Sequence, residues 1–190
     1  NGLPNPGLTW ETSEQIDLGL DMRFLNNRLS ATIDYFDKKT KDLLVSVTPP
    51  IEFGHSSQTI NGGTVLNRGL EIEVSWKDQI GDFAYGVSAN FTTLKNEVLD
   101  LPAGVPRIER TDASSTNYTI ATAFEPGYPV WYLRGFNYEG TDAEGNPVLT
   151  DVDGNGSIDA GDKMFIGQGI PTYTYGLNIN LAWKGLDFTL

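Results

Sequence analysis

The sequence predicts an all-β fold, an antiparallel segment of a transmembrane β-barrel with about six strands. Three observations lead to this prediction. Apolar and polar residues alternate strictly in several stretches of about ten residues, the length that a tilted strand needs to cross a bilayer. The connections between these stretches are alternately short and long, as in outer-membrane barrels. Aromatic residues gather near both ends of the stretches, where the two membrane interfaces would lie.

The first predicted hairpin follows an irregular lead-in, residues 1–12, that is rich in proline and glycine. Its two strands cover residues 15–24 and 29–37. One face of the first strand carries only apolar side chains, which are Ile16, Leu18, Leu20, Met22 and Phe24. The turn contains Asn26 and Asn27, and asparagine tolerates the positive φ values that a tight hairpin demands.

The second predicted hairpin joins strands at residues 68–77 and 83–92. Its apolar face repeats the alternation with Leu70, Ile72, Val74 and Trp76 on one strand and Phe83, Tyr85, Val87, Ala89 and Phe91 on the other. Gly81, in the connection 78–82, suits a tight turn. A strand of this kind has one apolar side and one polar side.

The third predicted hairpin consists of residues 173–183 and 186–190, joined by Lys184 and Gly185. The apolar face of its first strand carries Tyr173, Tyr175, Leu177, Ile179, Leu181 and Trp183. The chain stops at Leu190, inside an alternating run. We therefore expect it to be a fragment of a larger protein.

Two long connections, residues 38–67 and 93–172, are expected to be extracellular loops. In the first, residues 43–48 are expected to form a strand beyond the main sheet, which Pro49 and Pro50 would end. Residues 1–190 are interpreted as one partial β-barrel domain.

A soluble β-sandwich is the alternative that alternation alone leaves open, because each sandwich strand also has one apolar face. A sandwich, however, does not require aromatic rings at both strand ends. Rings stand near the short turns at Phe24, Trp76, Phe83 and Trp183, and near the long connections at Tyr35, Phe91 and Tyr173. This placement favours the barrel.

Composition excludes several classes of protein. The 190 residues contain no cysteine and carry a net charge of −12, which argues against a disulfide-stapled module and disfavours nucleic acid as a partner. Residues 95–163 hold twelve acidic and five basic residues, so much of the acidity lies in one connection. No apolar run approaches the roughly 18 residues of a membrane-spanning helix.

Several motifs occur in an order that resembles a known family. They include Asn5-Pro6-x-Leu8-x-Trp10-Glu11-Thr12, Leu25-Asn26-Asn27-Arg28-Leu29-Ser30, Asn67-Arg68-Gly69-Leu70-Glu71-Ile72 and Ile170-Pro171-Thr172-Tyr173. Together they resemble the C-terminal half of SusC/RagA-type TonB-dependent transporters, and the resemblance covers nearly the whole chain.

The resemblance implies a barrel of about 22 strands in the bacterial outer membrane, with a plug and a TonB-contacting region that we expect outside this sequence. It also implies import of oligosaccharides or peptides, a SusD-like lipoprotein as lid, and no enzymatic activity. Two rival hypotheses are a soluble calcium-binding β-sandwich that binds glycans and an extracellular glycanase. For the glycanase, Glu71 and Glu73 would be the carboxylate pair; we favour the interpretation that they line a hydrated bore.

Residues 151–162 match the calcium loop of EF-hand proteins, with oxygen donors at positions 1, 3, 5, 9 and 12 and glycine at position 6. The candidate ligands are Asp151, Asp153, Asn155, Ser157 through its backbone carbonyl, Asp159 and Asp162. Asp162 is shorter than the usual glutamate. The expected role of Ca²⁺ is structural, because no flanking helices are evident; the alternative is an Asp/Gly turn without metal.

Aromatic residues of the second long connection are candidates for stacking on a substrate, chiefly Trp131, Tyr132 and Tyr128. The alternative, which we favour, is that they form the packed core of a long loop. His55 is the only histidine, and no Gly-x-Ser-x-Gly sequence accompanies it. No catalytic residue is predicted.

Overall fold

The computed structural model describes residues 3–47, 52, 54, 57–111 and 120–190, so that His55 lies outside the described residues. The described chain is almost entirely β-structure. It divides into two compact units. The first unit comprises Asn1–Thr12, Lys41–Val65 and Glu97–Ile170, and the second comprises Ser13–Thr40, Leu66–Asn96 and Pro171–Leu190.

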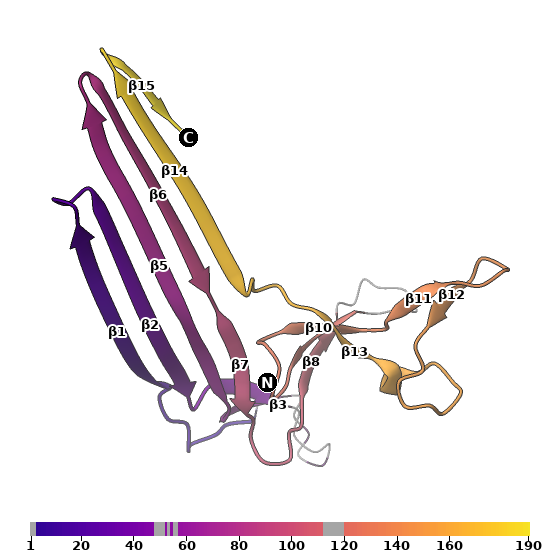
Figure 1. Cartoon of the computed structure of the whole chain (residues 1–190). Coiled ribbons are helices and arrows are strands. Elements are labelled where there is room, and N and C mark those ends of the chain that lie inside the picture. Colours follow the sequence, from indigo (N-terminus) through magenta and orange to yellow (C-terminus); the bar gives the residue numbers. More distant parts are fainter. Residues whose placement is uncertain (1–2, 48–51, 53, 55–56, 112–119) are drawn as a thin grey trace. The chain divides into compact units, whose positions relative to one another are not determined.

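The second unit is built on the long strands of a seven-stranded sheet, which lie side by side (Figure 1). Their order is β1 (Thr12–Phe24), β2 (Leu29–Lys41), β5 (Thr64–Ile80), β6 (Phe83–Thr93), β14 (Tyr173–Trp183) and β15 (Leu186–Thr189). Off this path, β7 (Lys95–Asp100) pairs with β5. The strands lie where the alternation predicts them, but β1, β2 and β5 extend several residues further, because backbone pairing continues past the last strictly alternating residue.

The first hairpin turns as the two asparagines predict. Asn26 and Asn27 have φ values of 57° and 65°, and the N–H of Arg28 donates to the carbonyl oxygen of Leu25 at 3.2 Å. Leu25, which precedes them, also has a positive φ of 54°, so that three consecutive residues of the turn take the left-handed backbone conformation. The other two short turns also contain residues with positive φ, among them Gly81 (61°) and Gly185 (86°).

The two segments predicted as long extracellular loops, residues 38–67 and 93–172, contain several short strands. In the first, β3 (Leu44–Val47) pairs with β4 (Gln58–Asn61); β3 lies within the strand expected at residues 43–48. In the second, β13 (Met164–Gly167), β10 (Tyr132–Gly135), β9 (Ala121–Phe124) and β8 (Ile108–Thr111) form a sheet in that order, and β11 (Tyr138–Thr141) pairs with β12 (Pro147–Leu149). Strands of three or four residues are too short for alternation to reveal them.

The core of the first unit is formed by Val65, Val98 and Phe124. Five partly buried residues pack against it, namely Leu43, Leu101, Ile108, Val130 and Trp131. Among the described residues, no helix is both long enough and apolar enough to cross a bilayer.

Candidate functional site

One face of the seven-stranded sheet is apolar across neighbouring strands. In the β6–β14 pairing Leu177 lies opposite Ala89 and Ile179 opposite Val87, and in the β5–β6 pairing Val74 also lies opposite Ala89. Antiparallel pairing at this register places all of these side chains on one side. The hairpins predicted separately from alternation therefore combine into a continuous apolar surface.

This apolar face is exposed, which is unusual for such large side chains. Ile16, Leu18 and Leu177 expose 63%, 65% and 61% of their surface. Monomeric soluble proteins rarely expose a contiguous apolar area of this kind. A sandwich strand would bury the same residues against a second sheet, so the exposure disfavours the sandwich.

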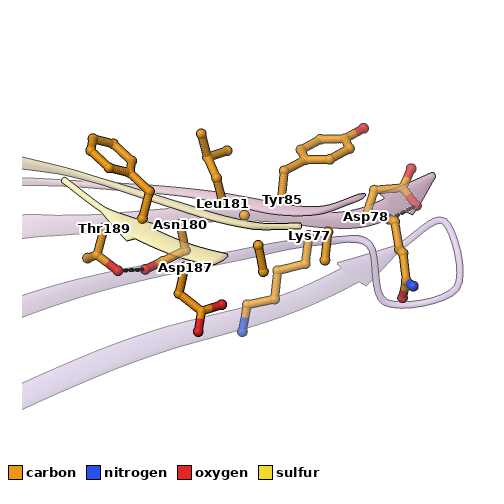
Figure 2. A pocket seen from close by; sticks show the side chains of 12 residues that line it. Lys77, Asp78, Tyr85, Asn180, Leu181, Asp187 and Thr189 are labelled. Carbon is orange, nitrogen blue, oxygen red and sulfur yellow. Dashed lines mark hydrogen bonds between the residues drawn. The ribbon is translucent and has the colours of Figure 1, made fainter. Parts of the chain in front are cut away.

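The opposite face of the same sheet is polar. Glu73 lies opposite Asn90 and Ser75 opposite Ser88, while Asn178 pairs with Ser88 from the other side. Figure 2 shows the two faces near the short turns, where Leu181 and Tyr85 project to one side and Lys77 and Asp187 to the other. Water is the natural neighbour of this second face.

Aromatic rings border the apolar face at both ends of the strands. Phe91 and Tyr173 stack with ring centroids 6.3 Å apart near the long connections. Phe83 and Tyr85 stack at 5.9 Å near the short turns, and Trp183 lies opposite Phe83. Amphipathic rings favour the interface between hydrocarbon and water.

The two glutamates proposed for glycoside hydrolysis belong to this polar face. Glu71 pairs with Thr92 and Glu73 with Asn90, and both glutamates are exposed. Neither ladder neighbour is a second acid or a base. The arrangement fits a hydrated lining better than an acid/base pair in a cleft.

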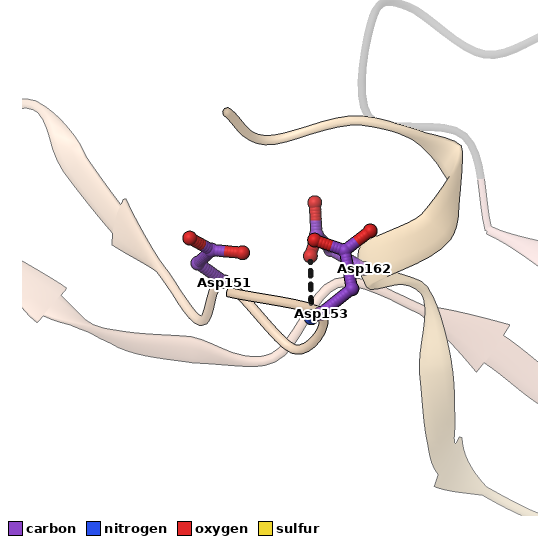
Figure 3. Close-up of side chains that lie close together, drawn as sticks. All are labelled: Asp151, Asp153 and Asp162. Carbon is purple, nitrogen blue, oxygen red and sulfur yellow. Dashed lines mark hydrogen bonds between the residues drawn. The ribbon is translucent and has the colours of Figure 1, made fainter. Parts of the chain in front are cut away.

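The acidic loop brings three of its predicted ligands together. One carboxylate oxygen from each of Asp151, Asp153 and Asp162 lies within 4.8 Å of the others, and Figure 3 shows these side chains converging. Oxygens bound to one Ca²⁺ lie about 2.3–2.6 Å from the ion, hence at most about 5 Å apart. The cluster therefore fits one calcium ion in size and in donor chemistry.

Asp162 anchors this loop. It is fully buried, and its carboxylate accepts hydrogen bonds from the backbone N–H groups of Asp159 and Val152, both at 2.8 Å. The bond from Asp159 is the largest cause that lowers the pKa of Asp162 below the usual aspartate value, against the opposing effect of burial. The carboxylate that stands at the usual glutamate position is therefore held in its ionised form.

The remaining predicted ligands hold the loop backbone. The side-chain oxygen of Asn155 accepts from the N–H of Ser157 at 2.8 Å. Asp159 caps the short 3₁₀ turn η2 (Ala160–Asp162) by accepting from the N–H of Gly161 at 2.7 Å. These bonds fix the curvature that points the three clustered carboxylates inward.

The three aromatic candidates for substrate stacking lie in different environments. Tyr132 is only 2% exposed, and Trp131 packs against the core of the first unit, with its ring 5.4 Å from that of Phe124. Tyr128 is 38% exposed and stacks on Tyr132 at 4.6 Å. A sugar ring needs an open aromatic face; Tyr128 is the most exposed of the three, and its ring also stacks on that of Phe165 at 6.1 Å.

Tyr132 belongs to a polar network that sequence reasoning missed. Its hydroxyl donates to Glu125 at 2.5 Å, Glu125 pairs with Arg107 at 3.5 Å, Arg107 with Glu109 at 2.6 Å, and Glu109 with Arg134 at 3.0 Å. Burial, followed by the bond to Glu125, raises the pKa of Tyr132. No spacing signal could have found this network, because its members come from β8, β9 and β10 and the segments beside them.

Removing the Tyr132 hydroxyl is expected to weaken the four-stranded sheet of the first unit. A buried hydrogen bond to a charged group contributes about 1.5–3 kcal/mol, so Tyr132→Phe should lower the local opening free energy of β9 and β10 by about 2 kcal/mol. Hydrogen exchange followed by mass spectrometry measures this. Tyr138→Phe is the matched control, because Tyr138 is 59% exposed and its hydroxyl shares an exposed hydrogen bond with that of Thr141. Equal protection in the two variants would contradict the expectation.

A twisted antiparallel sheet that exposes one apolar, aromatic-rimmed face and presents water with the other defines the wall of a membrane β-barrel. The barrel is not closed by the described residues. The chain belongs to the family described as "TonB dependent receptor-like, beta-barrel", which matches residues 1–190. The family resemblance found in the sequence motifs is thereby confirmed.

Individual relatives agree with this assignment. The chain is 32% identical to TonB-dependent receptor P3 of Formosa agariphila over 203 residues, and 33% identical to TonB-dependent receptor SusC of Bacteroides thetaiotaomicron over 196 residues. These alignments cover 98% and 97% of the chain but only 20% and 19% of the relatives. The chain thus spans about a fifth of the length of these proteins.

Solved structures show the same fold. The RagAB peptide importer in its open-open state aligns with a TM-score of 0.81 and 29% identity, over 99% of this chain and 21% of that chain. A second RagAB structure, the peptide transporter, gives a TM-score of 0.77 at 29% identity, over 98% of this chain and 21% of that chain.

Proposed function

We propose that the chain forms part of the barrel wall of a TonB-dependent importer of the SusC type in the bacterial outer membrane. The observation that carries the proposal is the exposed apolar face, continuous in register from β5 to β15. Lipid tails would cover this face, and the polar face would line a water-filled bore. The alternative of a soluble calcium-binding sandwich is not favoured, because a sandwich would leave no such face uncovered.

Detergent dependence tests the membrane location. The protein should fractionate with the outer membrane and stay monodisperse only in detergent, because the apolar face otherwise associates with itself. A protein that is monodisperse in plain buffer after removal of detergent would contradict the proposal.

The proposed cargo is an oligosaccharide or a peptide, and the proposed partners are TonB and a SusD-like surface lipoprotein that acts as lid. The relative named SusC and the peptide importer RagAB support this choice of class. The polar face contributes a hydrated lining, and no enzymatic step is assigned to it. Growth on single glycan or peptide sources, compared between the parent strain and strains without this protein or without TonB, tests cargo and energy source separately.

We also propose that the loop 151–162 binds one structural Ca²⁺. The convergence of Asp151, Asp153 and Asp162 within 4.8 Å supports this, with Asn155, Asp159 and the Ser157 carbonyl as further donors. When bound, the ion would neutralise the negative charges of the clustered carboxylates and would reduce the conformational freedom of the loop. The role that we assign to the ion is structural, namely to keep the loop in order.

Asp153→Asn is expected to weaken calcium binding about tenfold or more, because it removes one anionic ligand from the cluster. Terbium luminescence of the purified protein, with calcium as competitor, measures the affinity. Asp142→Asn is the matched control, because it removes the same single negative charge from a different turn. There the Asp142 carboxylate accepts a hydrogen bond from the backbone N–H of Asn146. If the parent protein shows no saturable terbium signal that calcium displaces, the loop is an Asp/Gly turn without metal.

A further inference from the structure

A small pocket lies on the polar face of the seven-stranded sheet, next to its first short turn. Its lining consists of Arg23, Asn27, Arg28, Ser30, Ser75 and Lys77. Each of these side chains can donate a hydrogen bond, three carry a positive charge, and none is acidic. We call this set the basic pocket.

Local structure forces the three cations of the basic pocket together. The tight turn at Asn26 and Asn27 folds Arg28 back toward the strand that carries Arg23. The backbone N–H of Lys77 donates to the carbonyl oxygen of Arg28 at 2.8 Å, which places Lys77 beside Arg28 on the next strand. Like charges on adjacent positions of neighbouring strands are destabilising.

The surroundings only partly compensate this charge. Arg28 pairs with Asp78 at 3.2 Å, whereas no ion pair is found for Arg23 or Lys77 within the part of the chain that the structure describes. Asp187 projects from the same face as Lys77 (Figure 2) without pairing with it. Deeper along the face, Asp21 accepts from the Thr32 hydroxyl at 2.7 Å.

We propose that the basic pocket binds a carboxylate group. The hydrogen bond from Arg28 to Asp78 shows that a carboxylate binds one guanidinium here. Arg23, Lys77 and the two serine hydroxyls can bind a second carboxylate. A carboxylate there removes the repulsion between three neighbouring cations. The proposal does not depend on transport, because the pocket is a property of the folded sheet.

The carboxylate has two possible sources, an acidic side chain of a protein segment that lies along the polar face, or a free carboxylate solute. Zero-length coupling with a carbodiimide distinguishes them, because it joins the Lys77 amine only to a carboxylate in direct contact. We expect mass spectrometry of the purified protein to identify a link from Lys77 to an acidic residue other than Asp78 or Asp187. The double substitution Arg23→Gln/Arg28→Gln should reduce that link about tenfold.

If no such link forms, citrate serves as the probe for a free solute. At low ionic strength it should slow phenylglyoxal labelling of Arg23 and Arg28 about tenfold in the unsubstituted protein, and it should leave the exposed Arg68 unaffected. Lys184 is the positive control for the coupling, because it stands at the same end of the sheet and forms an ion pair with Asp82 at 3.8 Å. The proposal is overturned if Lys77 forms no new link and citrate protects neither arginine.

Discussion

Leu177→Arg is expected to destabilise the membrane-inserted protein by about 2–4 kcal/mol. Leu177 lies near the middle of β14 and is 61% exposed on the apolar face, opposite Ala89. In the bilayer its neighbours are lipid tails, and a guanidinium there loses its hydration. Reversible urea unfolding of the protein in phospholipid vesicles measures the change.

The adjacent residue supplies the control for this experiment. Asn178 points to the polar face, where it lies opposite Ser88, so Asn178→Arg adds the same charge to a water-filled side and should change the unfolding free energy by less than about 1 kcal/mol. Equal costs at the two positions would mean that the apolar face does not meet lipid, and the barrel-wall assignment of the faces would fail.

Gly69→Ala should lower the free energy of unfolding at least as much as Leu177→Arg, for a steric reason. A Cβ built at Gly69 would lie 1.9 Å from the carbonyl oxygen of Thr93 and 2.8 Å from the Phe36 ring. The first contact is with backbone, which cannot move without breaking the pairing of β5 with its neighbours. We expect a loss of more than about 3 kcal/mol, above the usual range for overpacking.

Gly86→Ala is the matched comparison within the same sheet. The nearest atom to a Cβ at Gly86 is the Lys77 Cγ at 3.6 Å, an ordinary contact, so this substitution should be close to neutral. A folded barrel migrates differently from the unfolded chain in gel electrophoresis. The temperature at which this difference disappears gives the melting temperature of each variant. Similar melting temperatures would show that the backbone near Gly69 adapts, contrary to the expectation.

Long-range alternation was enough to predict the main sheet. In a strand of ten or more residues that alternates strictly, all apolar side chains lie on one face. A slip of one residue in the pairing would move Leu177 and its apolar neighbours to the polar face. The pairing within each hairpin then follows from its short connection. By contrast, β9 offers only Ala, Thr, Ala and Phe, a pattern too brief to separate a strand from a loop, so the sheet of the first unit could not be predicted.

The acidic loop and the basic pocket differ in the same way in how far the sequence could predict them. The acidic loop could be predicted because its donors lie within twelve consecutive residues, so that spacing alone defines the geometry. The basic pocket collects Arg23 from β1, Arg28 from the turn after β1 and Lys77 from β5, and their proximity follows only from the pairing of β2 with β5. The one signal in the sequence is that each cation stands near a predicted short turn.

The pairing of β6 with β14 has a consequence for the order of assembly. Residues within each hairpin are neighbours along the chain and can zip together quickly, but Thr93 meets Tyr173 only after the intervening segment has been closed into a loop. Contacts between residues so far apart form slowly, because chain entropy is lost before pairing compensates it. The half-built sheet would meanwhile present unpaired backbone N–H and C=O groups along β6, where wrong strands could pair.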